Sequence, residues 1–384
     1  MENTSTAPLN ITAPVIALSL FAIASSYLMS IIPLMLSEYG MSSDIASLVA
    51  SSFYAGLLIG AIAIERLVAK TGHRNGFILC LALLCSTILL LPIFPHAEIW
   101  VVSRLVAGIA VAGIFVIVES WLLTGDASGR GKRLGMYMMF LYGGSSLGQL
   151  GINMFGVSGN APFVVILTLI VLAAISLMVI RSTQPECEQH DTMPFKQIMQ
   201  LSKPALVGCT VSGLVMGAIY GLMPLELTNR NVELNQVGNL MALIILGGML
   251  VQPIASWLLK YAARALLLAL FSLLGTFAIA LIAVFKSQSV LAGSLFVLGM
   301  ASFALYPVAI NLACDKLGDN YIVSATQVML FSYSVGSVLG PTVAYTFLAK
   351  EEGLMGYLFV TLLATSIYML ISSARHKPTL VAGG

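Results

Sequence analysis

The stretch LGMYMMFLYGGSSLGQLGINMFGVSGNAPFVVILTLIVLAAISLMVI, residues 134–180, carries no charged side chain between Arg133 and Arg181. A helix needs about 20 mostly apolar residues to cross a bilayer, so this one stretch holds two spans. A soluble core has no reason to exclude charge over such a length. The stretch therefore predicts two consecutive membrane-spanning helices, near 134–155 and 161–180.

The same spacing of charge recurs along the whole chain. Only 9% of the 384 residues are charged, whereas soluble domains carry about a quarter, and the mean hydropathy is +0.98. We therefore expect an all-α polytopic membrane protein of twelve spans. The other ten lie near 13–36, 44–65, 76–94, 99–123, 205–228, 236–258, 265–285, 289–313, 321–348 and 354–373.

A polar stretch divides these spans into two sets of six. It predicts an N-terminal six-helix bundle at 1–180, a cytoplasmic linker at 181–204 and a C-terminal six-helix bundle at 205–384. Similar residues recur at an offset of 191 in several helix pairs. The matches are Pro33 with Pro224, Gly56 with Gly247, Gly108 with Gly299, Phe140 with Phe331 and Tyr142 with Tyr333. One offset in several pairs predicts two six-helix pseudo-repeats with the same orientation in the membrane.

Lysine and arginine predict the orientation, because they gather in cytoplasmic loops. With the N-terminus inside, fourteen of the 18 basic residues fall in cytoplasmic segments, and three, Arg230, Lys286 and Lys350, fall outside. We therefore expect a multi-pass protein of the bacterial inner (plasma) membrane with both termini in the cytoplasm. The first apolar run is too long for a signal peptide and lacks a basic segment before it, so it reads as a retained span.

Several segments resemble the major facilitator superfamily, and its YcaD-like branch in particular. They include the basic loop Glu65–Arg74, the Arg-x-x-x-Gly pattern from Arg104 to Gly108, Val118–Trp121, Tyr220–Pro224 and Ser332–Pro341. The resemblance implies twelve helices, alternating access and a substrate site between the two halves. It also implies a cytoplasmic gate, for which the candidates are Glu65, Arg66, Lys70, Gly72, Arg74 and Arg130. Ala69 stands where the superfamily loop usually has Asp, and Glu65 lies one turn earlier.

Charged side chains inside a span usually face a cavity or a partner, because lipid solvates them poorly. Arg104 and Glu119 are the two clear cases, and they are 15 residues, or about 22 Å, apart on one helix. Arg104 is predicted to contact substrate or tune a proton site, or else to bond neighbouring carbonyls. Glu119 is predicted to form a latch with Arg130, Lys132 or Arg74, or else to carry protons or bind substrate.

Uncharged polar side chains form the next set of candidates. They are predicted to bind substrate or take part in coupling, with interhelical hydrogen bonding as the alternative for each. Helices 1, 4, 7 and 10 line the cavity in the fold that the chain resembles. The set comprises Tyr142, Gln149, Tyr220, Tyr306, Asn311 and Gln327.

Other classes of function find little support. All four histidines fall in or beside loops, which argues against a buried histidine relay, and the sequence has no GxxxxGK[ST] motif for ATP. Neither a Cys/His metal pattern nor a catalytic set is present, so we expect no cofactor, no metal and no enzyme activity.

The sequence thus favours a secondary active transporter of a small solute. We expect it to be proton-coupled, with export slightly favoured, to be monomeric in lipid and to bind no nucleic acid. The alternative is a non-transporting sensor or scaffold that has a transporter fold.

Overall fold

The computed structural model describes residues 12–123, 127–180, 202–285, 287–314, 322–348 and 353–375. Helices fill nearly all of these ranges, and the described part contains no strand. The chain forms two compact units, Met1–His190 and Asp191–Gly384. The division between them falls inside the predicted linker at 181–204, of which residues 181–201 lie outside the described ranges.

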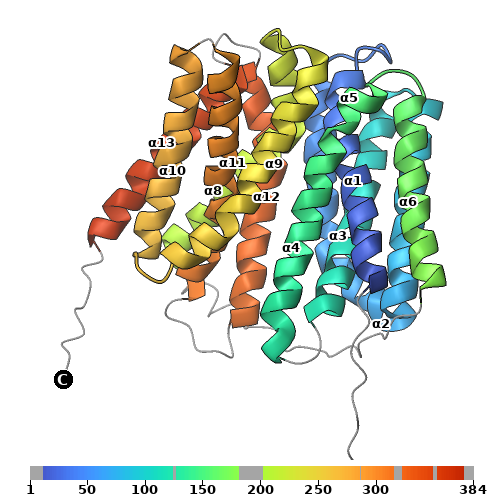
Figure 1. The fold of residues 1–384 in the computed structure, drawn as a ribbon, viewed down its shortest axis with the longest axis horizontal. Helices are drawn as coiled ribbons and strands as arrows, with labels where there is room; N and C mark the ends of the chain where they lie inside the picture. The colour runs from blue at the N-terminus through green and yellow to red at the C-terminus, as the bar shows by residue number, and fades with distance from the viewer. Residues whose placement is uncertain are drawn as a thin grey trace, which may run out of the picture. The chain divides into compact units, whose positions relative to one another are not determined.

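The described part of the first unit contains six helical elements (Figure 1). Their bounds are α1 Thr12–Met35, α2 Ile45–Ile93, α3 Ala97–Leu123, α4 Ala127–Gln149, α5 Gly151–Phe155 and α6 Ala161–Val179. The long α2 is two spans, because Gly72 breaks it with φ 75° and ψ 168°. A residue with a side chain adopts that positive φ at a cost, so glycine marks the turn between the predicted spans 44–65 and 76–94.

The second unit has one helix for each predicted span. The bounds are α8 Lys203–Asn229, α9 Leu234–Leu258, α10 Arg264–Val284, α11 Gln288–Cys314, α12 Ile322–Leu348 and α13 Gly353–Arg375. Pro224 in α8 and Pro33 in α1 lie inside their helices, so both members of the predicted proline match fall in the first helix of a unit.

Within the described residues, eleven helical segments are long and apolar enough to cross a membrane. The predicted span 134–155 is the exception, because glycine, serine and glutamine make α4 the least apolar of the long helices. The helix also ends at Gln149, and the short α5 follows it, so this span is interrupted where a continuous helix was expected. The all-α fold of two six-helix repeats is otherwise as predicted.

The two units repeat the same close helix crossing, which confirms the pseudo-repeat. A Cβ added to Gly56 would lie 1.9 Å from the Leu105 carbonyl oxygen, and one on Gly247 would lie 2.1 Å from that of Phe296. The reciprocal contacts repeat as well: a Cβ added to Gly108 would lie 2.0 Å from the Phe53 carbonyl oxygen, and one on Gly299 would lie 2.0 Å from that of Ile244. Each contact in the second unit involves residues 191 positions after those in the first.

The crossing of α1 with α4, and of α8 with α12, corrects two predicted matches. Gly148 of α4 packs on the Ile23 carbonyl of α1, and Gly340 of α12 packs on the Leu214 carbonyl of α8. Ile23 and Leu214 keep the offset of 191, whereas the two glycines are 192 apart. The predicted equivalences of Phe140 with Phe331 and of Tyr142 with Tyr333 are therefore one residue out of register, because the second unit has one more residue than the first between the two crossings, from Gly299 to Gly340.

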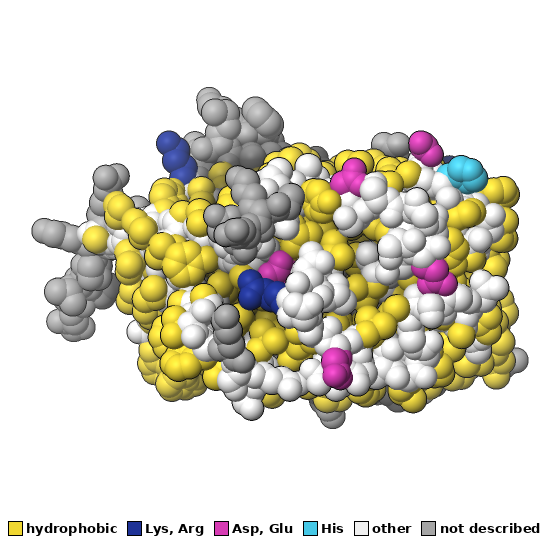
Figure 2. Space-filling model, turned by 90° about the horizontal axis from the view of Figure 1, so that it is seen from above, with side chains coloured by type: hydrophobic (Ala, Val, Ile, Leu, Met, Phe, Trp, Pro, Cys, Tyr) yellow, Lys and Arg dark blue, Asp and Glu magenta, His cyan; other side chains and the backbone are white. Residues whose placement is uncertain are grey.

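Large apolar side chains cover the outside of the helices. Ile62, Met154, Val179 and Val284 are each more than 70% exposed. Figure 2 shows hydrophobic side chains around the flanks and only scattered charges on the end face. Water would penalise so much exposed apolar surface, whereas lipid tails solvate it, so this surface fits a membrane protein.

Candidate functional site

Arg104 is buried in the first unit, about 10 Å from the start of α3 at Ala97. Its side chain is 4% exposed. Nη2 donates a hydrogen bond to Met29 Sδ of α1 at 3.0 Å, and the guanidinium lies 4.3 Å from the centroid of the Phe53 ring of α2. Three helices therefore meet at this cation.

These contacts leave the charge of Arg104 weakly compensated. A thioether sulfur is a weak acceptor, an aromatic face offers a quadrupole rather than an anion, and Nε has no hydrogen-bond partner. Among the described residues, no carboxylate lies within ion-pair distance of Arg104. A buried carboxylate of the second unit, Glu226, pairs with Arg230 instead. The structure thus holds a buried guanidinium ready to accept an anionic partner.

Glu119 lies on the same helix toward its other end. It is exposed, and its Oε1 accepts a hydrogen bond from Tyr137 Oη of α4 at 3.0 Å. Of the basic residues predicted to pair with it, Arg74 bonds the Met178 carbonyl, while the side chains of Arg130 and Lys132 fall outside the described part. A hydroxyl donor leaves the carboxylate able to take up a proton or to change partners.

Gln149 lies in a buried polar network between α1 and α4. Its side chain is 0% exposed; Nε2 donates to Ser26 Oγ at 2.6 Å and to the Ser26 carbonyl at 3.1 Å. Ser30 Oγ donates to Gln149 Oε1 at 2.6 Å. Because both donors and the acceptor are occupied, these contacts favour the interhelical role among the two predicted for Gln149.

The tyrosine candidates of the second unit lie in aromatic pairs. The Tyr220 ring of α8 meets Phe303 of α11 edge-on, with centroids 6.2 Å apart. Tyr306 of α11 lies 4.8 Å from Tyr333 of α12 at 55°. Both predicted tyrosines are half-buried, as is Tyr142 of α4 in the first unit. Their rings offer surfaces that can pack on an apolar solute or on a neighbouring helix.

Asn311 and Gln327 are exposed side chains near the ends of α11 and α12 that the sequence places on the cytoplasmic side. Asn311 Nδ2 donates to the carbonyl of Pro307, one turn earlier, at 2.8 Å. That bond is local to one helix, so it keeps the amide folded back along α11.

The predicted gate lies around the break in α2. Arg74 Nη2 donates to the Met178 carbonyl at the end of α6, which ties the break to the last helix of the unit. Lys70 is exposed and Gly72 supplies the turn. The side chains of the remaining gate candidates, Glu65, Arg66 and Arg130, are outside the described part.

His73 lies beside the turn at Gly72, as the sequence predicts, but its side chain is buried. It is 3% exposed, its Nε2 lies 2.8 Å from Ser120 Oγ, and its ring packs edge-on to Trp121 at 6.0 Å. The turn at Gly72 directs the following residue back against α3.

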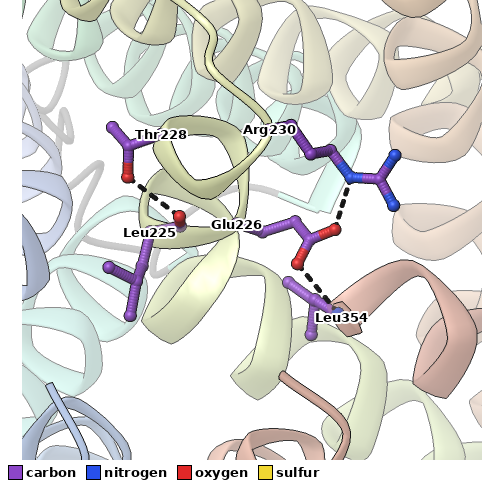
Figure 3. A network of polar contacts seen from close by, with 5 residues as sticks. All are labelled: Leu225, Glu226, Thr228, Arg230 and Leu354. Atoms are coloured by element: carbon purple, nitrogen blue, oxygen red, sulfur yellow. Dashed lines mark hydrogen bonds and ion pairs between the residues drawn. The ribbon is translucent and has the colours of Figure 1, made fainter. Parts of the chain in front are cut away.

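Glu226 is a buried carboxylate, although the sequence indicated only Arg104 and Glu119 as charged side chains inside spans. It is 2% exposed, near the end of α8 (Figure 3). Oε1 accepts from Arg230 Nε at 2.5 Å and Oε2 accepts from the backbone N–H of Leu354 at 2.9 Å. Its i, i+4 spacing from Arg230 was readable in the sequence, whereas its contact with α13 depends on tertiary packing.

The family model described as Major Facilitator Superfamily matches residues 15–341, which is most of the chain and crosses both units. The chain belongs to the major facilitator superfamily. Curated relatives that are transporters of this superfamily support the assignment. Uncharacterized MFS-type transporters YcaD of Escherichia coli strains 55989 and SMS-3-5 are each 33% identical over 377 residues, covering 95% of this chain and 96% of the relative.

Solved major facilitator structures share the fold. A mutant of the nucleoside transporter NupG aligns with a TM-score of 0.76 at 12% identity, over 95% of this chain and 99% of that one. A bacterial homologue of the human lysosomal transporter Spinster aligns at 0.72 and 14% identity, over 95% of both chains. At such identities the likeness concerns the fold alone. Together with the YcaD relatives, it makes this chain a multi-pass membrane transporter of the major facilitator type.

Proposed function

We propose that this protein moves a small solute across the inner membrane by alternating access, coupled to protons, with export as the favoured direction. The observation that carries the proposal is Arg104, a buried guanidinium without a carboxylate among the described residues. A charge is costly inside a membrane protein, and such residues mark pathways and coupling sites.

Glu119 is the group that we propose for the proton. It lies in the same helix as Arg104, about 22 Å from it by helix rise, and its described partner is the neutral hydroxyl of Tyr137. Because no fixed cation holds Glu119 in the described part, protonation would break no ion pair there. Movement of α3 against α4 would then alter the Glu119–Tyr137 bond and couple protonation to conformation.

The half-buried rings of Tyr142, Tyr220 and Tyr306 are the side chains that we propose to contact the apolar part of the solute. Gln327 and Asn311 remain candidates at the ends of their helices. Gln149 is more plausibly part of the helix packing, because its amide is already satisfied.

The test is flux in proteoliposomes, with solute uptake measured directly on the washed vesicles and proton movement reported by a trapped pH-sensitive dye. Solutes from a metabolite and drug library are added with and without an imposed pH gradient. At least one solute should move protons with wild-type protein, and Arg104→Ala should reduce that flux by tenfold or more, which corresponds to about 1.4 kcal/mol. Glu119→Gln should retain solute binding but lose the response to the pH gradient.

Each component of the proposal has its own contradicting result. If no library solute produced flux, a sensor or scaffold with a transporter fold would replace transport as the explanation. Unchanged flux in Arg104→Ala would remove Arg104 from the mechanism. Equal flux with and without the pH gradient would contradict proton coupling.

A further inference from the structure

The surroundings of Arg104 specify what kind of partner it accepts. The guanidinium rests on the Phe53 ring at 4.3 Å, bonds the Met29 thioether and is 4% exposed. Phe53 in turn packs edge-on to Tyr54, with centroids 5.5 Å apart. The side chains that contact the guanidinium are therefore aromatic and polarisable, and they carry no charge of their own.

Charge balance in the described chain leaves Arg104 without a protein counter-ion. Glu119 is about four turns away on the same straight element, beyond the reach of the side chains. Glu226 is already engaged by Arg230 and by the N–H of Leu354. Neither of these two intramembrane carboxylates therefore neutralises the guanidinium of Arg104.

Met29 fits the role of a temporary occupant. Its sulfur is a weak acceptor on a flexible, unbranched side chain, so an anionic oxygen would displace it from Nη2 and form a stronger, charge-assisted bond. The unpartnered Nε could donate to the second oxygen of the same carboxylate, since arginine commonly binds carboxylates through two parallel bonds.

From this geometry we propose that the solute is a monovalent organic anion, a carboxylate on an apolar or aromatic body, whose acid group binds Arg104. This rests on the proposed transport function and names its substrate class. One guanidinium balances one negative charge. A strongly hydrated inorganic anion such as phosphate would lose more hydration in an aromatic, thioether-lined site than one guanidinium returns, whereas an apolar body packs favourably there.

The test compares matched acids and amides by thermal unfolding of the purified, detergent-solubilised full chain. The probes are 2-naphthoate, indole-3-acetate and phenylacetate, each beside its neutral carboxamide, with inorganic phosphate as a further control. At saturating concentration at least one acid should raise the unfolding midpoint by about 2 °C or more, by mass action. Its amide and phosphate should raise it by less than a quarter as much.

Variants identify the residue that recognises the acid. Arg104→Met should abolish the acid-induced shift, and Arg104→Lys should weaken binding about tenfold, because lysine keeps the charge but loses the two-bond geometry. Arg230→Met is the matched control: it removes a cation that already has a carboxylate partner, and the acid-induced shift should persist.

The stability of the ligand-free protein distinguishes an anion-binding role of Arg104 from a purely structural one. If Arg104 waits for an anion, Arg104→Met should unfold at the same or a higher temperature than wild type without ligand, because an uncompensated buried charge is gone. A midpoint lowered by several degrees would show that Arg104 instead holds α1, α2 and α3 together, and would overturn the proposal. So would equal shifts from acid and amide, or no shift from any acid.

Failure here is distinguishable from failure of transport. If only neutral solutes gave flux in the proteoliposome assay, the proposal of transport would hold and the proposal that the solute is an organic anion would be overturned. Acid binding that needs Arg104, without flux of any solute, would leave the anion site standing and overturn transport.

Discussion

At the scale of single residues, Glu226 shows how a carboxylate is kept inside a largely apolar protein. Both of its oxygens are used, one by Arg230 and one by the N–H of Leu354 at the start of α13 (Figure 3). The positive end of the α13 dipole adds to the attraction. In the first unit, exposed Glu38 likewise accepts the N–H of Gly159, shortly before α6, at 2.8 Å.

Glu226→Ala should destabilise the protein by about 1–3 kcal/mol, because it leaves the buried Leu354 N–H without its acceptor. Thermal or denaturant unfolding of the detergent-solubilised protein measures the change. Glu233→Ala is the control, since Glu233 is exposed and its side chain caps no helix. Equal effects of the two substitutions would contradict the role assigned to Glu226.

At the scale of helices, the glycine crossings decide which elements pack together. The helices α2 and α3, and likewise α9 and α11, approach so closely that a side chain on either glycine of the crossing would overlap a backbone carbonyl. Small residues commonly permit such approach between membrane helices. Because backbone cannot give way as a side chain can, these crossings should behave as rigid pairs during any rearrangement of a unit.

Gly299→Ala should therefore cost about 1–3 kcal/mol of stability, since the new Cβ would lie 2.0 Å from the Ile244 oxygen. Gly293→Ala, on the same helix, meets no atom within 4 Å and should be neutral or stabilising by up to about 1 kcal/mol through helix propensity. Unfolding midpoints and folded yields of the pair provide the measurement. A loss of stability in Gly293→Ala as large as in Gly299→Ala would refute this account of the crossing.

At the scale of the whole molecule, orientation follows from the distribution of basic residues. We propose that both ends of the chain lie in the cytoplasm, which puts residue 287 outside and residue 263 inside. In a variant whose native cysteines are replaced by serine, Ser287→Cys should react with an impermeant maleimide in intact cells, and Ala263→Cys only after lysis. The reverse pattern would invert the topology.

The proposed orientation also places Arg104 and Glu119 relative to the two sides of the membrane. The helix that carries both Arg104 and Glu119, α3, runs from the proposed outer side to the inner side, so the guanidinium would lie nearer the outside and the carboxylate nearer the cytoplasm. An anion at one end of α3 and a proton at the other suit a cycle in which the two sites are exposed at different times. The flux and maleimide measurements together test that arrangement.

The amino-acid sequence by itself determined the spans, the six-plus-six division and the family. Lipid acts locally on every residue, so the absence of charge over each span is visible in the sequence without knowledge of contacts. It also indicated Arg104 and Glu119, because charges inside spans stand out against that background. The break in α4 before α5 was less visible, since glycine, serine and glutamine weaken a span without forbidding it.

Only the tertiary structure decided which side chains meet. It placed Arg104 on Phe53 and Met29, satisfied Gln149 with two serines, and buried His73. It also showed that α12 matches α4 at an offset of 192 residues, one more than the offset of the other crossing. These outcomes depend on where helices far apart in sequence cross and how closely glycine lets them approach, and no local pattern of apolar residues records that geometry.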